Sequence, residues 1–159
     1  MRIVHDFIQD IERLTINFQS KIHNRNIHLI TSLDGSIEIE AAPSAIRQVI
    51  ANLMTNALDA VYKGGEIEIS LRRNDGMAEI SVRDDGPGIP EQTSQHLFEP
   101  FFTTKGDSGT GLGLWVSKGI VEKHGGRIEF TTDISEAGHG TTFRIILPLL
   151  AAASEQTAA

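Results

Sequence analysis

The sequence has no cysteine among its 159 residues, so disulfide bonds and thiolate metal sites are excluded. It also lacks an apolar run near the ~18 residues that a membrane-spanning helix needs, and residues 1–10 carry no signal-peptide pattern. Basic residues are few, because 14 lysines and arginines face 21 aspartates and glutamates, for a net charge of −7. This balance argues against nucleic acid as a partner. It also means that an anionic ligand must be held by local groups.

Two common nucleotide-binding motifs are missing as well. The chain has no GxxxxGK[ST] sequence and no GxGxxG after a predicted strand, so neither a P-loop nor a Rossmann site is supported. The length and the 40% content of hydrophobic residues indicate one globular domain with a substantial core. We expect this domain to cover residues 1–148 and residues 149–159 to form a disordered tail.

Hydrophobic periodicity predicts a mixture of helices and strands. Apolar residues recur at steps of three and four in residues 4–22, 43–62 and 112–124, which predicts three helices. On the last of these we expect Leu112, Val116, Gly119 and Ile120 to be buried and Trp115 to pack. Alternating apolar residues predict six strands. They are 27–33 and 37–41 around the turn 34–36, the hairpin 66–73 and 77–84, and finally 127–132 and 141–147.

The most unusual stretch of the sequence is residues 84–113. A predicted strand ends at Asp84 and Asp85, and the turn Gly86-Pro87-Gly88 follows at once. Beyond it come an aromatic cluster, one cation and four glycines, namely Phe98, Phe101, Phe102, Lys105, Gly106, Gly109, Gly111 and Gly113. Glycine reaches backbone conformations that other residues avoid. We therefore expect residues 100–109 to form a flexible lid over an anionic ligand, with the phenylalanines anchoring its near end. The N-terminus of a helix that begins near Gly111 should face the anion.

A polar stripe borders the apolar face of the predicted helix 43–62. Asn52, Asn56 and Asp59 lie on this stripe at about 100° per residue. One interpretation is a solvated surface. The other is a metal site, because amide oxygens are suitable ligands for Mg²⁺. Spacing alone leaves both interpretations open.

Five segments in chain order resemble the conserved boxes of a known family. They are NLMTNALDA, DDGPGIP, LFEPFFTTK, GTGLGL and GHGTTF. They resemble the N, G1, F, G2 and G3 boxes of the ATP-binding catalytic domain of sensor histidine kinases, with NALDA and PFFTTK nearest to the nitrogen-regulation and dicarboxylate-sensing kinases. That family shares a superfamily with DNA gyrase, the ninety-kilodalton heat-shock chaperone and the mismatch-repair ATPase. The resemblance implies a Bergerat-type α/β two-layer sandwich, with a mixed five-stranded sheet, helices on one face, and ATP between helices and lid.

The resemblance also implies roles for individual residues. Asp84 matches the aspartate that accepts a hydrogen bond from the adenine amino group, and Gly86 and Gly88 match the turn that lets the base approach. Asn56 matches the Mg²⁺ ligand, and Asn52 lies one turn earlier on the same stripe. The remaining nucleotide-binding matches are the phosphate-side residues Gly109, Thr110, Gly111, Leu112 and Gly113, and Thr141 at the base end. Lys105 is the candidate cation for the γ-phosphate, and with Asn52 it forms the predicted catalytic pair.

Two residues depart from the family pattern. Asp59 stands where many sensor kinases carry a lysine, so that phosphate contact is missing. Asp85 replaces a common asparagine, and a second acid beside Asp84 is expected to raise one pKa of the pair.

The identity of Asn52 separates the functional hypotheses. Relatives that hydrolyse ATP, and anti-sigma serine kinases, carry a glutamate there as general base, a role that an amide cannot fill at neutral pH. We therefore favour a histidine kinase over an anti-sigma-type serine/threonine kinase or a non-catalytic nucleotide-sensing module. The expected partners are a histidine-bearing dimerisation domain and a downstream response regulator, with no membrane contact by this domain.

The acceptor histidine itself is not recognisable in this chain. His5 is followed by Asp6, but the proline expected five residues later is replaced by Asp10. We assign no role to His5, and no metal to His124 or His139. The chain is accordingly expected to be a monomeric, cytoplasmic piece of a longer kinase.

Overall fold

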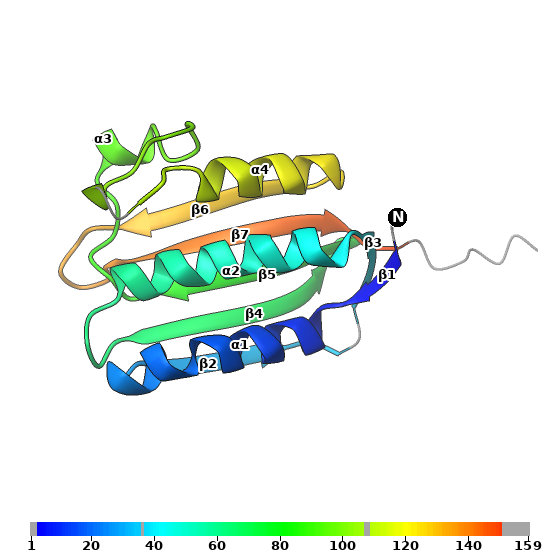
Figure 1. Ribbon diagram of the computed structural model, residues 1–159, viewed down its shortest axis with the longest axis horizontal. Coiled ribbons are helices and arrows are strands. Elements are labelled where there is room, and N and C mark those ends of the chain that lie inside the picture. The colour runs from blue at the N-terminus through cyan, green and yellow to red at the C-terminus, as the bar shows by residue number, and fades with distance from the viewer. Residues whose placement is uncertain (1–2, 36, 107–108, 151–159) are drawn as a thin grey trace, which may run out of the picture.

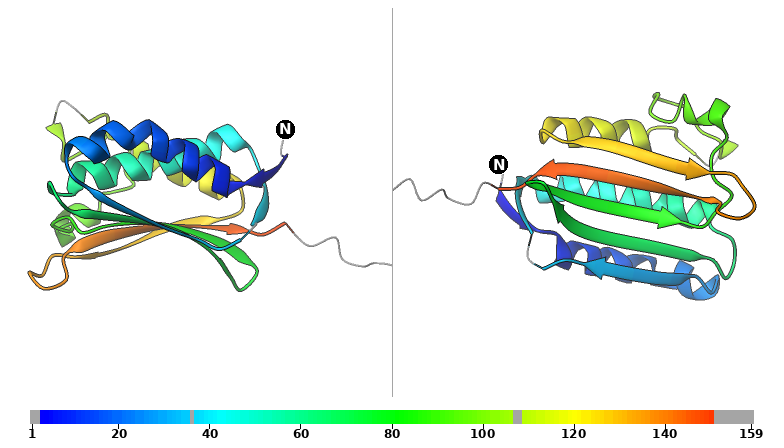
Figure 2. Two further views of the ribbon diagram at one scale, coloured as in Figure 1. Left: turned by 90° about the horizontal axis from the view of Figure 1, so that it is seen from below. Right: turned by 180° about the vertical axis from the view of Figure 1, so that it is seen from behind.

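The computed structural model describes residues 3–35, 37–106 and 109–150, which form two layers (Figure 1). One layer is a five-stranded sheet in the order β2-β4-β5-β7-β6. Its strands are β2 (His28–Leu33), β4 (Glu66–Asn74), β5 (Met77–Asp84), β6 (Arg127–Asp133) and β7 (Gly140–Pro148). Strands β2 and β4 are parallel and the other pairs antiparallel, so the sheet is mixed. Helices cover only one of its faces (Figure 2), which confirms the predicted fold class.

The N-terminal part of the chain corrects one prediction. Val4 was expected in a helix, but it lies in strand β1 (Ile3–Asp6), and helix α1 begins only afterwards (Phe7–Asn24). Strand β1 pairs antiparallel with β3 (Glu38–Ala41) in a second, two-stranded sheet. The segments 27–33 and 37–41 are therefore not partners of each other, because β2 pairs with β4 instead. The predicted turn between them includes Ser36, which lies outside the described residues.

Helix α2 (Pro43–Ala60) crosses the middle of the sheet and supplies much of the core. Pro43 suits the first helical position, where a backbone N–H would have no intrahelical partner. The buried residues of α2 are Ile46, Val49, Ile50, Leu53, Met54, Ala57 and Leu58. At the other end Arg25 donates to the carbonyls of Leu58 and Val61. A guanidinium there satisfies terminal carbonyls and complements the helix dipole.

Helix α4 (Gly113–Lys123) packs beside α2, and Ile120 of the face predicted for it is partly buried against the core. Its fully buried side chains are Ser117 and Val121, each 0% exposed, whereas Gly119 is exposed. Trp115 is 49% exposed, so its predicted packing role is wrong. At the end of α4, His124 donates from Nδ1 to the Ile120 carbonyl at 2.7 Å and accepts the Ala42 N–H at Nε2 at 3.1 Å. This histidine ties the end of α4 to the start of α2.

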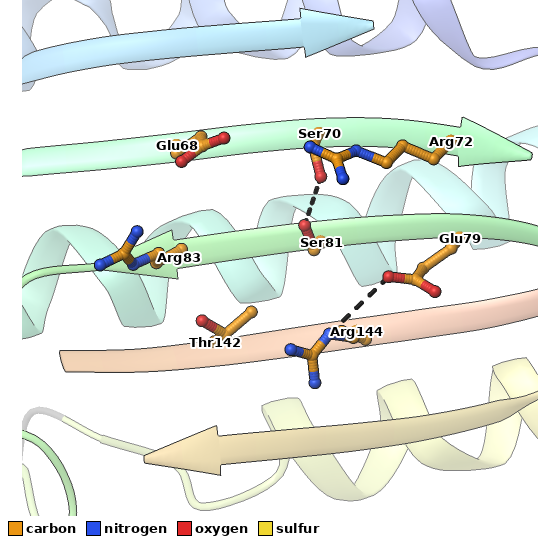
Figure 3. Close-up of a pocket in the computed structure, with 8 residues that line it drawn as sticks. All are labelled: Glu68, Ser70, Arg72, Glu79, Ser81, Arg83, Thr142 and Arg144. Atoms are coloured by element: carbon orange, nitrogen blue, oxygen red, sulfur yellow. Dashed lines mark hydrogen bonds and ion pairs between the residues drawn. The ribbon is translucent and has the colours of Figure 1, made fainter. Parts of the chain in front are cut away.

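The uncovered face of the sheet carries polar side chains from β4, β5 and β7 around a shallow pocket (Figure 3). Glu68 lies opposite Arg83, and Arg72 lies opposite Glu79. Glu79 also pairs with Arg144 at 3.7 Å. Because its charges alternate in sign across neighbouring strands, we assign no ligand to this pocket. Among the described residues, no helix has the combined length and hydropathy to cross a membrane.

Candidate functional site

Most of the residues predicted to bind a ligand converge at one end of the helical layer. Asp84 ends β5, Asn52 and Asn56 lie on α2, and Gly113 begins α4. The segment between β5 and α4, which contains the short helix α3 (Glu91–Ser94), lies at the same end, beside β6 and the start of α4 (Figure 1). Residues 107–108 of the predicted lid lie outside the described residues.

Asp84 is a buried carboxylate, only 4% exposed. Its Oδ1 accepts the backbone N–H of Gly86 at 2.9 Å, and the carboxylate also accepts the backbone N–H of Thr141. Burial raises the pKa of Asp84 from 3.8 to about 6, although these two hydrogen bonds oppose the rise. The neighbouring Asp85 charge, which was expected to be the cause, raises this pKa least among these effects. Asp85 instead accepts the N–H of Glu66 at 2.9 Å.

The two glycines after Asp84 lie where the backbone leaves no space for a side chain. A Cβ on Gly86 would lie 2.7 Å from the carbonyl oxygen of Ala60. A Cβ on Gly88, where φ is +79°, would lie 2.1 Å from the carbonyl oxygen of Asp133. Both substitutions would force the backbone apart, so the turn after Asp84 depends on glycine.

Two residues without a predicted role fasten this turn to the β6–β7 hairpin. His139 donates from Nδ1 to the Gly86 carbonyl at 2.8 Å, and Thr132 accepts the Ile89 N–H at 2.8 Å. Thr132 also shares a hydrogen bond with the hydroxyl of Thr141 at 2.9 Å. Thr132 had no sequence signal, because its contact depends on how two distant loops meet. His139 lies within the GHGTTF segment, which could have suggested it.

The polar stripe on α2 is engaged by two other elements. The ammonium of Lys105 lies 3.2 Å from Asn56 Oδ1 and 2.5 Å from Asp59 Oδ2. Asn52 donates from Nδ2 to the Gly113 carbonyl at 3.2 Å and to the Ser117 hydroxyl at 3.1 Å. The stripe is therefore not simply a solvated surface, since it contacts the lid and helix α4.

The glycine-rich turn before α4 is tightly folded. A Cβ on Gly109 would lie 2.3 Å from the Thr103 hydroxyl, and a Cβ on Gly111, where φ is +69°, would lie 2.3 Å from the Phe101 backbone. Thr110 accepts the Leu112 N–H at 3.4 Å, just before the first turn of α4. The N–H groups of that first turn have no intrahelical partners, so this helix end can receive an anion.

The phenylalanines near the lid behave differently from one another. Phe98 packs against Phe130 with ring centroids 6.0 Å apart, as predicted for an anchor. Phe102 is partly buried and contacts His96 at 5.6 Å. Phe101 is 76% exposed, so its predicted anchoring role is wrong. Its backbone, which has a φ of +66°, lies close to Gly111 instead.

The residues around Asn56 fit a magnesium ion that is held mainly by phosphate oxygens and water. Among the described residues no group of three histidines or carboxylates could enclose a metal. Mg²⁺ does not require such a cage, because it keeps several waters and binds one or two protein oxygens together with phosphates. The Lys105 ammonium already places a positive charge against the oxygens of Asn56 and Asp59. This donor set therefore favours a cation.

Comparison with known proteins identifies the family. Residues 41–151 match the family described as histidine kinase-, DNA gyrase B- and HSP90-like ATPase. The chain is 41% identical to the sensor histidine kinase ZraS of Escherichia coli (strain K12) over 128 residues, which cover 80% of this chain and 27% of ZraS. It is 37% identical to sporulation kinase E of Bacillus subtilis (strain 168) over 142 residues, covering 89% of this chain and 19% of that kinase. The chain thus spans about a quarter or less of these relatives.

Solved structures agree with this assignment. The catalytic domain of the histidine kinase ThkA is 32% identical and superposes with a TM-score of 0.82, covering 93% of this chain and 95% of that domain. ThkA in complex with the response regulator protein TrrA gives a TM-score of 0.80 at 29% identity, covering 94% of this chain and 42% of that one. The chain therefore belongs to the histidine kinase-, DNA gyrase B- and HSP90-like ATPase family, and within it to the catalytic domains of sensor histidine kinases.

Proposed function

We propose that this domain binds Mg²⁺-ATP and donates the γ-phosphate to a histidine on a dimerisation domain outside this chain. One observation carries the proposal. A buried carboxylate in a glycine-lined turn lies at one side of the site, while an amide oxygen, a lysine and a helix N-terminus lie at the other. These are complementary to a purine amino group and to a chain of phosphates, respectively.

Each side of the site would bind a different part of ATP. Asp84 would accept a hydrogen bond from the adenine amino group, with Gly86 and Gly88 allowing the base to approach and Thr141 closing the base end. The phosphates would lie against residues 109–113 at the start of α4. Asn56 would hold Mg²⁺, which neutralises charge on the phosphate oxygens when bound. Lys105 would contact the γ-phosphate.

The chain's own groups favour transfer to an external histidine over hydrolysis of ATP. Hydrolysis needs a group that takes a proton from water, and the amide of Asn52 cannot do so. Its nitrogen is in addition engaged by Gly113 and Ser117. An imidazole acceptor is already nucleophilic and needs no such base. A response regulator would then receive the phosphoryl group from that histidine. We also propose that this domain is cytoplasmic. The isolated domain would be monomeric.

Incubation with γ-labelled ATP tests this function. The isolated chain should bind ATP yet accumulate no acid-labile phosphohistidine, because phosphoryl transfer requires a nucleophile positioned in line. Adding a separate dimerisation domain that bears the acceptor histidine should produce label on that domain, since what the isolated chain lacks is a nucleophile held close to the γ-phosphate. Asp84→Ala is the matched control and should strongly reduce that label when ATP is limiting, because the variant binds ATP more weakly. Stoichiometric label on the isolated chain would contradict the proposal, and label on a serine would indicate an anti-sigma-type kinase.

A further inference from the structure

Lys105 and Asp59 form an ion pair that joins the lid to helix α2. The Lys105 ammonium lies 2.5 Å from Asp59 Oδ2 and 3.2 Å from Asn56 Oδ1. Lys105 comes from the segment between Phe101 and Gly106, whereas Asp59 lies in the last turn of α2. The pair therefore connects the described part of the lid to the helix that carries the proposed magnesium ligand.

The two oxygens that face Lys105 form one site on the helix surface. Asn56 and Asp59 are three residues apart, so their side chains lie next to each other on one face of α2. An ammonium has three hydrogens to donate, and here it is directed at both neighbouring oxygens. On the lid, the N–H of Lys105 is bonded to the Thr103 hydroxyl at 3.0 Å, which shapes the backbone that presents the lysine.

An aspartate at this position would by itself oppose the binding of a triphosphate. Asp59 lies one turn from Asn56, so its negative charge would repel phosphate oxygens there. The ion pair changes this balance, because Asp59 holds a cation at the same place. The carboxylate on α2 and the ammonium on the lid then act together as a nearly neutral unit, and Asp59 still holds the ammonium beside the site when the Asn56 oxygen is taken by Mg²⁺.

We propose that Asp59 is a positioning residue that places Lys105 at the phosphate end of the nucleotide site. The proposal rests on the proposed function, because it assumes that the phosphates of ATP lie beside Asn56. Asp59 does not contact the nucleotide and acts only through Lys105. The lid cation is consequently in place before ATP arrives.

The exposure of the pair sets the size of the expected effect. The Lys105 side chain is 35% exposed and that of Asp59 is 44% exposed. Ion pairs with this much solvent contact change equilibria by about two- to fivefold.

Hydrogen exchange of the nucleotide-free chain tests the contact without any ligand. Asp59→Asn and Lys105→Met should each speed exchange at the amides of Lys105 and Gly109 by about two- to fivefold. Glu122→Gln is the matched control, because it removes one carboxylate from the Lys118–Glu122 ion pair, which is 3.9 Å long and lies on α4. Unchanged exchange in both test variants would overturn the proposal.

Calorimetry with ATP and ADP tests the positioning role. In the presence of Lys105, Asp59→Asn should lower the preference for ATP over ADP by about two- to fivefold. In a Lys105→Met background the same substitution should cause no such loss, and Asp59→Glu should retain the preference. An equal shift in both backgrounds would mean that Asp59 acts directly on the phosphates, which would overturn the proposal. A parent chain that bound no ATP would refute the proposed function itself. Unchanged exchange together with normal ATP binding would refute only the role of Asp59.

Discussion

The carboxylate of Asp84 accepts the backbone N–H of Gly86 at 2.9 Å, within the same turn that the two residues form. The bond fixes the orientation of the carboxylate before any ligand is present. The same turn leaves little room for a side chain at Gly86, since a Cβ there would lie 2.9 Å from Asp84 Oδ1 and 2.7 Å from the Ala60 carbonyl oxygen. A preorganised acceptor of this kind favours one arrangement of a bound base.

Asp84→Ala should weaken ATP binding by roughly 10- to 150-fold, because a hydrogen bond to a charged group contributes about 1.5–3 kcal/mol. The preference for ATP over GTP should fall as well, since the carboxylate accepts from an amino group and repels a carbonyl. Calorimetric titration with both nucleotides measures these effects. Asp75→Asn, in the exposed β4–β5 turn, is the control. An Asp84→Ala variant that binds ATP as tightly as the parent would disprove the placement of the base.

Asp84 should also make the stability of the nucleotide-free chain depend on pH. Burial raises its pKa from 3.8 to about 6, so the folded state favours the protonated acid. The raised pKa therefore adds to the free energy of unfolding. This added stability is fully present below about pH 4 and is lost as the pH rises through about 6. Asp84→Asn avoids burying a charge. It should therefore raise the free energy of unfolding by about 1–3 kcal/mol near pH 8 and by little near pH 4. Urea titrations at both pH values measure this, and an equal gain at both would refute it.

Asn56→Leu should abolish the Mg²⁺ dependence of ATP binding while leaving weak, metal-free binding. The substitution keeps the size of the side chain but removes the oxygen that would bind the metal. Titrating ATP with and without Mg²⁺ measures the difference. Thr55→Val is a suitable control, because that hydroxyl donates to the Ala51 carbonyl of its own helix. The same magnesium response in parent and Asn56→Leu would rule out Asn56 as a ligand.

His124→Ala should lower the free energy of unfolding by about 1–3 kcal/mol, because both ring nitrogens are hydrogen-bonded between α4 and α2. Loss of the ring leaves the Ala42 N–H without this partner. Chemical denaturation monitored by circular dichroism gives the value. The exposed His23 on α1 supplies the control, and its replacement by alanine should change stability by less than about 0.5 kcal/mol. Equal stability of the two variants would contradict the prediction.

Short-range signals predicted much of the fold. The Asn74-Asp75-Gly76 turn joins β4 and β5 as expected, and Asp84 ends its strand beside the glycines that its turn requires. What failed depended on distant partners. Strand β1 exists because it pairs with β3, which lies more than thirty residues later, and its four residues carry no periodicity of their own.

The candidate site was predicted unevenly for the same reason. Asp84 stands in a local pattern, at the end of an alternating strand and just before a glycine turn, whereas the spacing of Asn56 left two interpretations open until the family resemblance was considered. The contact of Asn52 with Ser117 depends on how α2 and α4 pack, and so does the buried face of α4. Lys105 was predicted near the phosphates, but its pairing with Asp59 joins segments 46 positions apart in sequence. No pattern along the chain encodes such a contact.

The alternating charges on the open face of the sheet also bear on how β4 and β5 align during folding. In the native register Glu68 lies opposite Arg83 and Arg72 lies opposite Glu79. A slip of two residues would keep every side chain on its own face, so the hydrophobic core would oppose it only weakly. The same slip would separate both pairs of opposite charges. The solvent-facing residues of this hairpin thus discriminate against misaligned pairings that burial alone would tolerate.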